Sequence, residues 1–156
     1  MKFSNKLMLA LLVIGLAGVS AVQAQEKRIQ RSDLPPAVEK TVAEQSKDAT
    51  IRGFSTEIEN GKRLYEAELT VNGHGKDISM TEDGNIVEVE EQVSMDSLSP
   101  EVKAGLTKAA DSGTISKIES ITKGGKLVAY EAVVKHGEKR SEVQVGPDGN
   151  KLDHEE

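Results

Sequence analysis

The feature that most constrains the fold of this 156-residue chain is an internal repeat at an offset of 64 to 65 residues. The segments that begin at Leu34 and Leu98 read LPPAVEKTV and LSPEVKAGL. The same order of short motifs then recurs in both halves: Thr-Ile, Gly-Lys, Tyr-Glu-Ala and Asp-Gly-Asn. Self-similarity at a fixed spacing is the signature of repeated structural units, so the sequence predicts a duplication.

Each half opens with a helical pattern, in which apolar residues recur at every fourth position. These positions are Leu34, Val38 and Val42 in the first half and Leu98, Val102 and Leu106 in the second. Ser99 is a favourable N-cap residue, and Pro100 follows at the first helical position, where the missing N–H costs nothing. Pro36 takes the equivalent place in the first half. We therefore expect one helix at the start of each half.

The period then changes to two, which is typical of strands with one buried face. The alternating apolar positions include Tyr65, Ala67, Leu69 and Val71 in the first half and Tyr130, Ala132 and Val134 in the second. Both tyrosines fall on the apolar face, so we expect them in the core. Asn-Gly and Asp-Gly pairs between the strands favour tight hairpins. Each half thus reads as a helix followed by an antiparallel meander, with a last strand that is short in the second half.

These patterns predict an α+β protein of two tandem units, each a helix packed on its own three- to four-stranded antiparallel sheet. The predicted order is a signal peptide at 1–24, a flexible lead-in at 25–33, unit 1 at 34–90, a linker at 91–97, unit 2 at 98–152 and a tail at 153–156. A lone unit of this size buries little core, so we expect the two units to touch.

The N-terminal segment has the three parts of a signal peptide. Lys2 and Lys6 precede an apolar run at 7–19, and Val22 and Ala24 suit the −3 and −1 positions of a cleavage site after Ala24. The run is shorter than the about 20 residues that span a bilayer. The chain has no cysteine, which excludes lipoprotein attachment and disulfides. The sequence therefore predicts a periplasmic or secreted protein with no transmembrane segment in its mature part.

The mature chain is acidic, because residues 1–24 remove two lysines and shift the net charge from −6 to about −8. Such a balance argues against nucleic-acid binding, which needs a concentrated basic surface. We expect Glu66, Glu68, Glu88, Glu90 and Glu91 to form a negative stripe on the wet face of the sheet. A stripe of this kind has three interpretations: it keeps the protein soluble, it binds a basic partner, or it binds divalent cations.

No arrangement of residues suggests catalysis, and we predict no catalytic, cofactor-binding or metal-ligating residue. There is no cysteine and no G-x-S-x-G motif. His74 and His136 fall at equivalent turns and His154 in the acidic tail, which favours surface positions over a clustered zinc site. Asp83 and Asp148 begin Asp-Gly-Asn turns that lack the alternating oxygens and closing glutamate of an EF-hand calcium loop.

Three motifs together resemble the PepSY-like domain family, in the branch likened to β-lactamase inhibitory proteins. They are L-P-x-x-V at a helix start, Y-E-A in the strand after a Gly-Lys turn, and D-G-N before a last strand. The resemblance covers 34–90 and 98–152. It implies tandem units that pair a helix with a four-stranded antiparallel sheet, in an extracytoplasmic binding or inhibitory module without catalytic residues.

The leading hypothesis is therefore an exported, non-enzymatic module that uses its exposed sheet face to bind another exported protein. Inhibition or regulation of an envelope or secreted protease or other hydrolase is a narrower version, implied by the family alone. The alternative is a divalent-cation sensor or buffer of the envelope that uses the acidic face. An enzyme is the least favoured class.

Overall fold

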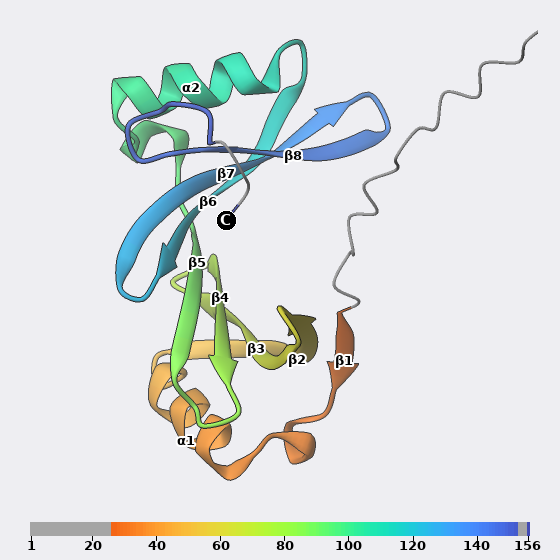
Figure 1. Ribbon diagram of the computed structural model, residues 1–156. Coiled ribbons are helices and arrows are strands. Elements are labelled where there is room, and N and C mark those ends of the chain that lie inside the picture. Colours follow the sequence, from red (N-terminus) through yellow and green to blue (C-terminus); the bar gives the residue numbers. More distant parts are fainter. Residues whose placement is uncertain (1–25, 153–155) are drawn as a thin grey trace, which may run out of the picture.

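The computed structural model describes residues 26–152 and Glu156 (Figure 1). The predicted signal peptide at 1–24 and residues 153–155 of the predicted tail lie outside the described residues. Within the described part, no helix is long and apolar enough to cross a membrane. The elements, in chain order, are β1 Lys27–Ile29, η1 Arg31–Asp33, α1 Pro36–Gln45, β2 Ala49–Glu59, β3 Lys62–Val71, β4 His74–Thr81, β5 Ile86–Gln92, η2 Met95–Ser97, α2 Pro100–Ala110, β6 Thr114–Lys123, β7 Lys126–His136 and β8 Lys139–Val145.

All the strands of the described chain belong to one antiparallel sheet, in which each strand pairs with its neighbour in sequence from β1 to β8. The two halves of the chain meet at β5 and β6, which pair from Glu88 with Lys123 to Gln92 with Glu119. The prediction of two tandem units, each a helix on its own sheet, is therefore wrong: the protein has one continuous, mostly β, eight-stranded sheet with two α-helices. The physical reason lies in the edge strands. In separate sheets, β5 and β6 would each leave a row of unpaired backbone N–H and C=O groups, and these groups are satisfied when the two strands pair.

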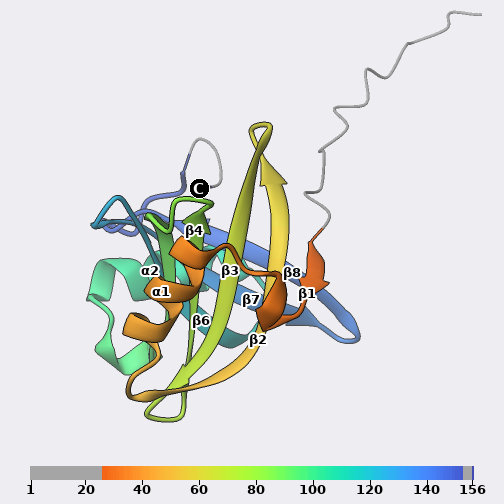
Figure 2. The same cartoon turned by 90° about the horizontal axis from the view of Figure 1, so that it is seen from below.

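The two helices lie on the same face of the sheet and at opposite ends of it (Figures 1 and 2). Val38 and Val42 of α1 are buried with Phe54, Tyr65, Ala67, Leu69, Ile78 and Met80. Val102 and Leu106 of α2 are buried in a second cluster with Leu98, Ile118, Ala132 and Val145. The predicted apolar stripes are thus the core faces of both helices. Tyr65 is buried as expected, and Tyr130 packs half-buried against the second cluster.

Each helix is held by contacts with the loops around it. Ser99 Oγ accepts a hydrogen bond from Val102 N at 3.2 Å, which confirms the predicted N-cap of α2. In the middle of α1, Thr41 Oγ1 donates a hydrogen bond to Gly84 O at 2.8 Å, so the Asp-Gly-Asn turn after β4 packs on this helix. Gly149, in the equivalent turn after β8, has φ +78° and lies so close to the α2 backbone at Glu101 that a side chain would overlap it.

The structure adds detail to three of the predicted segments. The lead-in at 25–33 contains β1, which pairs with residues 54–56 of β2, and Ile29 packs against the first core cluster. The linker at 91–97 contains the end of β5 and the 3₁₀ turn η2. The short last strand of the second half is reduced to one bridge between Val145 and Lys151. The lead-in and the linker therefore both contribute backbone pairing or turns to the fold.

Candidate functional site

The face of the sheet opposite the helices, here called the open face, carries most of the strand carboxylates. Side chains alternate across a strand, so Tyr65 and Ala67 enter the core while Glu66 lies on the open face. The antiparallel register then aligns acidic residues across three strands. Glu66 of β3 is opposite Ser79 of β4, which is opposite Glu88 of β5. In the next row, Glu68 is opposite Asp77, which is opposite Glu90.

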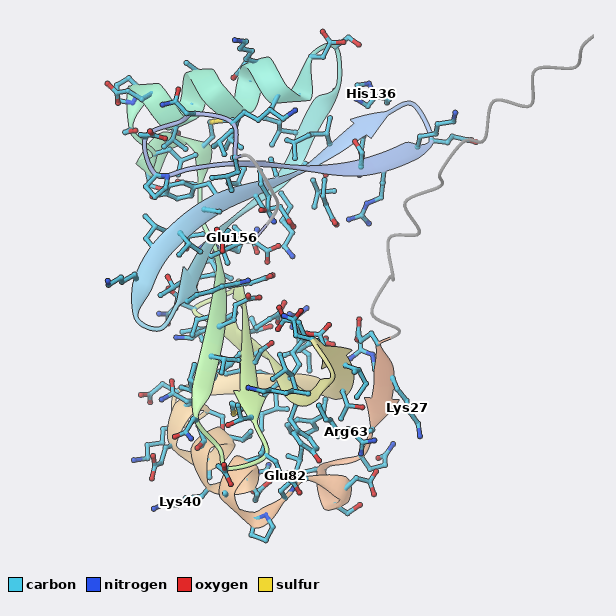
Figure 3. The ribbon with its side chains drawn as sticks, viewed as in Figure 1. Lys27, Lys40, Arg63, Glu82, His136 and Glu156 are labelled. Atoms are coloured by element: carbon cyan, nitrogen blue, oxygen red, sulfur yellow. The ribbon has the colours of Figure 1, made fainter. Side chains whose placement is uncertain are left out.

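These rows form one wall of an acidic cleft with a volume of about 480 Å³. The acidic cleft is lined by Glu57, Glu59, Leu64, Glu66, Asp77, Ser79, Glu88, Glu90, Lys123 and Glu156. Seven of these residues carry a carboxylate side chain and one carries a positive charge. Glu156 lies between the two halves of the curved sheet (Figure 3), and its backbone N–H donates to Gln144 Oε1 at 2.8 Å.

Some of the carboxylates on the open face have a cation beside them. Lys123 Nζ lies 3.0 Å from Glu88 Oε2, and Arg52 Nη2 lies 2.9 Å from Asp77 Oδ1. The remaining pairs on this face, within the described part of the chain, are Arg28 with Glu26 and Glu68, and Lys117 with Glu119. Among the described residues, neither Glu66 nor Glu90 forms an ion pair, so the acidic cleft holds more negative charge than its own cations balance.

Burial and crowding disfavour the charged forms of the unpaired carboxyls. Burial, followed by repulsion from Asp77, raises the pKa of Glu66 to about 7. Burial, followed by repulsion from Glu88, raises the pKa of Glu90 to about 8. Burial also raises the pKa of Asp77, although Arg52 opposes the shift. Glu66 and Glu90 therefore hold protons near neutral pH, and a cation that approaches them would displace those protons.

The structure brings most of the predicted stripe together. Glu66, Glu68, Glu88 and Glu90 lie on the open face as predicted. The prediction for Glu91 is wrong: it follows Glu90 directly in β5 and so lies on the other face, where its carboxylate pairs with Lys76 Nζ at 2.8 Å.

The open face also carries acidic residues that were not part of the predicted stripe, among them Asp77, Glu57 and Glu119. Asp77 alternates with the buried Ile78 and Met80, so its position could have been read from the period of β4. Glu57 follows from the period of β2 in the same way. Glu119 is different, because its approach to β4 and β5 depends on the pairing of β5 with β6, for which the sequence carries no local signal.

His74, His136 and the two Asp-Gly-Asn turns lie apart from this cleft. His74 begins β4 and His136 ends β7, each exposed beside a tight turn; Figure 3 shows His136 near the tip of the β7–β8 hairpin. In the second Asp-Gly-Asn turn, Asn150 N and Asn150 Nδ2 donate to the carboxylate of Asp148 at 3.0 and 2.8 Å. That carboxylate is already used by the turn itself. His154 lies outside the described residues.

Comparisons with known proteins find the same fold in solved structures. No family model matches the sequence, and no curated protein matches it. A DUF2874 family protein from Bacteroides ovatus ATCC 8483 is 19% identical, with a TM-score of 0.59 over 76% of this chain and 84% of that chain. A protein from Bacteroides eggerthii DSM 20697, provisionally described as periplasmic, is 15% identical, with a TM-score of 0.61 over 76% of this chain and 86% of that chain.

A third solved structure bears on the predicted resemblance. It is described as a BLIP-like protein from Bacteroides fragilis NCTC 9343, and it is 18% identical, with a TM-score of 0.54 over 74% of this chain and 81% of that chain. This similarity of fold fits the predicted likeness to β-lactamase inhibitory proteins, while the PepSY-like label stays a prediction. At these identities the similarity is one of fold: the chain shares the architecture of the DUF2874 and BLIP-like structures.

Proposed function

We propose that this chain is a periplasmic, non-enzymatic binding module whose acidic cleft receives a basic segment of another exported protein. The observation that carries the proposal is the composition of the cleft, in which seven carboxylates surround a single lysine. A concave surface lined by one sign of charge concentrates its field and attracts ligands of the opposite sign. A lysine or arginine side chain is the protein group of matching charge.

The unpaired carboxyls support this choice of partner. Glu66 and Glu90 have no cation of their own among the described residues, and burial keeps part of each population protonated near neutral pH. An incoming ammonium or guanidinium group favours the ionised form of a nearby carboxyl and makes charge-assisted hydrogen bonds with it. The cleft therefore gains interactions with a basic segment that it does not have alone.

The location and the non-enzymatic class rest on other observations. The predicted signal peptide supports export, and the Bacteroides eggerthii structure of the same fold is provisionally described as periplasmic. Among the described residues, the acidic cleft is lined by carboxylates, one serine, one lysine and one leucine, without a histidine or cysteine to activate a nucleophile. Inhibition of an exported protease or other hydrolase is a narrower version, supported by the family resemblance and the BLIP-like fold neighbour.

Charge reversal in the cleft tests the proposal. Binding of fluorescent peptides rich in lysine and arginine would be measured by anisotropy at low and high salt, with acidic peptides of equal length as the comparison. We expect Glu57→Lys with Glu59→Lys to weaken binding of the basic peptide by about tenfold or more. Glu44→Lys with Glu82→Lys makes the same change in net charge at exposed positions outside the cleft, and should leave most of the affinity.

Two results would contradict the proposal. One is equal binding of basic and acidic peptides by the unaltered protein. The other is an equal loss of affinity in the cleft variant and in its matched control, which would mean that net charge alone attracts the peptide. Capture of a partner from periplasmic extract is then informative only if the cleft variant loses that partner and the control variant keeps it.

A further inference from the structure

Three carboxylates meet where the two halves of the sheet join. Asp77 of β4, Glu90 of β5 and Glu119 of β6 each offer an oxygen, and these oxygens lie within 4.8 Å of one another. Asp77 is directly opposite Glu90, and Glu119 is opposite Gln92, one row further along β5. The group, here called the seam triad, therefore exists only because β5 pairs with β6.

The most buried member of the seam triad is Glu119, which is 4% exposed. Its Oε1 atom is buried and receives no hydrogen bond within the described part of the chain. Lys117 Nζ lies 2.6 Å from this oxygen as a counter-ion, but outside hydrogen-bond geometry. A buried carboxylate oxygen without a hydrogen bond is costly, and here it belongs to a group of three converging acidic side chains.

The cations of the protein do not balance the seam triad. Arg52 pairs with Asp77 and Lys117 with Glu119, which leaves Glu90 without a partner among the described residues. Glu90 is opposite Ile121, which is 2% exposed, so the surroundings offer little solvation on that side. One further positive charge would therefore lower the electrostatic energy of this cluster.

We propose that Asp77, Glu90 and Glu119 form a divalent-cation site suited to Ca²⁺, and that Lys117 is the counter-ion that a bound cation displaces. The ligand set consists of carboxylate oxygens, which suit hard cations such as Ca²⁺ better than they suit softer metals. Oxygens separated by up to 4.8 Å suit the about 2.3–2.6 Å bonds of Ca²⁺ better than the about 2.0–2.1 Å bonds and strict octahedron of Mg²⁺. Waters complete the coordination.

Lys117 is able to leave, because its side chain is 37% exposed whereas that of Glu119 is 5% exposed. A bound ion would bridge β4, β5 and β6 and so cross-link the two halves of the sheet. The seam triad differs from the glutamate stripe that the sequence suggested for cations, since Asp77 and Glu119 were not part of it. Asp77 and Glu90 also line the acidic cleft, so a bound cation and the basic partner proposed above would compete for these carboxylates, and the cation is tested without peptide.

Isothermal titration calorimetry of the chelator-treated chain with CaCl₂ and with MgCl₂ tests the proposal. We expect Ca²⁺ to bind with a Kd in the range of about 10⁻⁴–10⁻³ M that is typical of extracellular modules, and more tightly than Mg²⁺. Glu90→Gln should weaken binding by about tenfold or more, and Glu119→Gln likewise. Lys117→Met should strengthen it by about fivefold, because it removes a competing charge.

Glu57→Gln with Glu59→Gln is the matched control, since it removes charge from the same cleft at a distance from the seam triad. The proposal is overturned if no heat is seen up to about 10 mM Ca²⁺. It is also overturned if the control variant loses as much affinity as Glu90→Gln, or if Lys117→Met does not bind more tightly. If Glu119→Gln does not fold, the more exposed Glu90 and Lys117 positions still decide the outcome, with Ca²⁺-dependent Tm as the second readout.

Discussion

Glu66 and Glu90 show how strongly single residues of this protein depend on their surroundings. Both were expected on a wet, solvated face, and both lie on the predicted face. The curvature of the sheet and the neighbouring acidic residues nevertheless bury them enough to raise the pKa of Glu66 to about 7 and that of Glu90 to about 8. Sequence could assign their side of the strand but not their solvation, because solvation depends on which other strands enclose them.

The raised pKa values predict that the protein becomes less stable as pH rises toward 8. Below about pH 4.5, both the folded and the unfolded chain hold these protons, so the contribution to stability is fully present. At higher pH the unfolded chain loses the protons, whereas the folded chain keeps that of Glu66 to about pH 7 and that of Glu90 to about pH 8. The free energy of unfolding should therefore fall by roughly 3 kcal/mol or more per residue across this range, at about 1.4 kcal/mol for each unit of pKa difference.

Urea unfolding in chelator-containing buffer at several pH values measures this dependence. Glu66→Gln and Glu90→Gln should each flatten the decline, since glutamine does not titrate. Glu82→Gln, at an exposed turn, should leave the pH profile unchanged. A profile that rises from pH 5 to pH 8 and is unaffected by either cleft variant would contradict the assignment.

At the scale of elements, the helices and hairpins follow local signals. The period of four over Pro36–Gln45 and Pro100–Ala110 marks both helices, and the period of two marks the strands that follow. The Asp-Gly-Asn turns do more than the sequence suggested. They reverse the chain and also bring the backbone of Gly84 and Gly149 against the helices, at a distance that only glycine allows.

We predict that Gly149→Ala destabilises the fold much more than an alanine at an open turn. The new methyl group would overlap the Glu101 carbonyl of α2 and would also have to accept a φ of +78°. Together these should cost about 2–4 kcal/mol. Gly137→Ala is the matched control, with φ +62° and no atom near its Cβ position, and should cost about 1 kcal/mol. Equal losses in chemical denaturation would show that Gly149 acts through its backbone angle alone.

At the scale of the whole molecule, the pairing of β5 with β6 makes one sheet out of two similar halves. The two core clusters remain distinct, one under each helix. They are coupled by the backbone hydrogen bonds of a central strand pair. This coupling also creates the open face as a continuous surface, because the acidic cleft draws residues from both halves.

We predict that this continuity makes unfolding a single cooperative transition. In differential scanning calorimetry of residues 25–156, the calorimetric and van't Hoff enthalpies should agree. Fragments 25–93 and 94–156 should each be largely unfolded, since each would expose an unpaired edge strand and bury a small core. Two separate transitions in the whole chain, or a cooperatively folded fragment, would show that the halves are independent units.

The sequence by itself determined where the two α-helices and most of the strands lie, and most of the residues that enter the core, although it gave no sign of β1 and placed Glu91 on the wrong face. These properties are local, because they follow from the periods of 3.6 and 2 and from the turn residues between them. Only the tertiary structure decided that the halves share one sheet. The backbone groups of a free strand edge are the same in every strand, so no side-chain pattern marks β6 as the partner of β5. The cleft and the seam triad depend on that choice, and therefore no reading of either half alone could have located them.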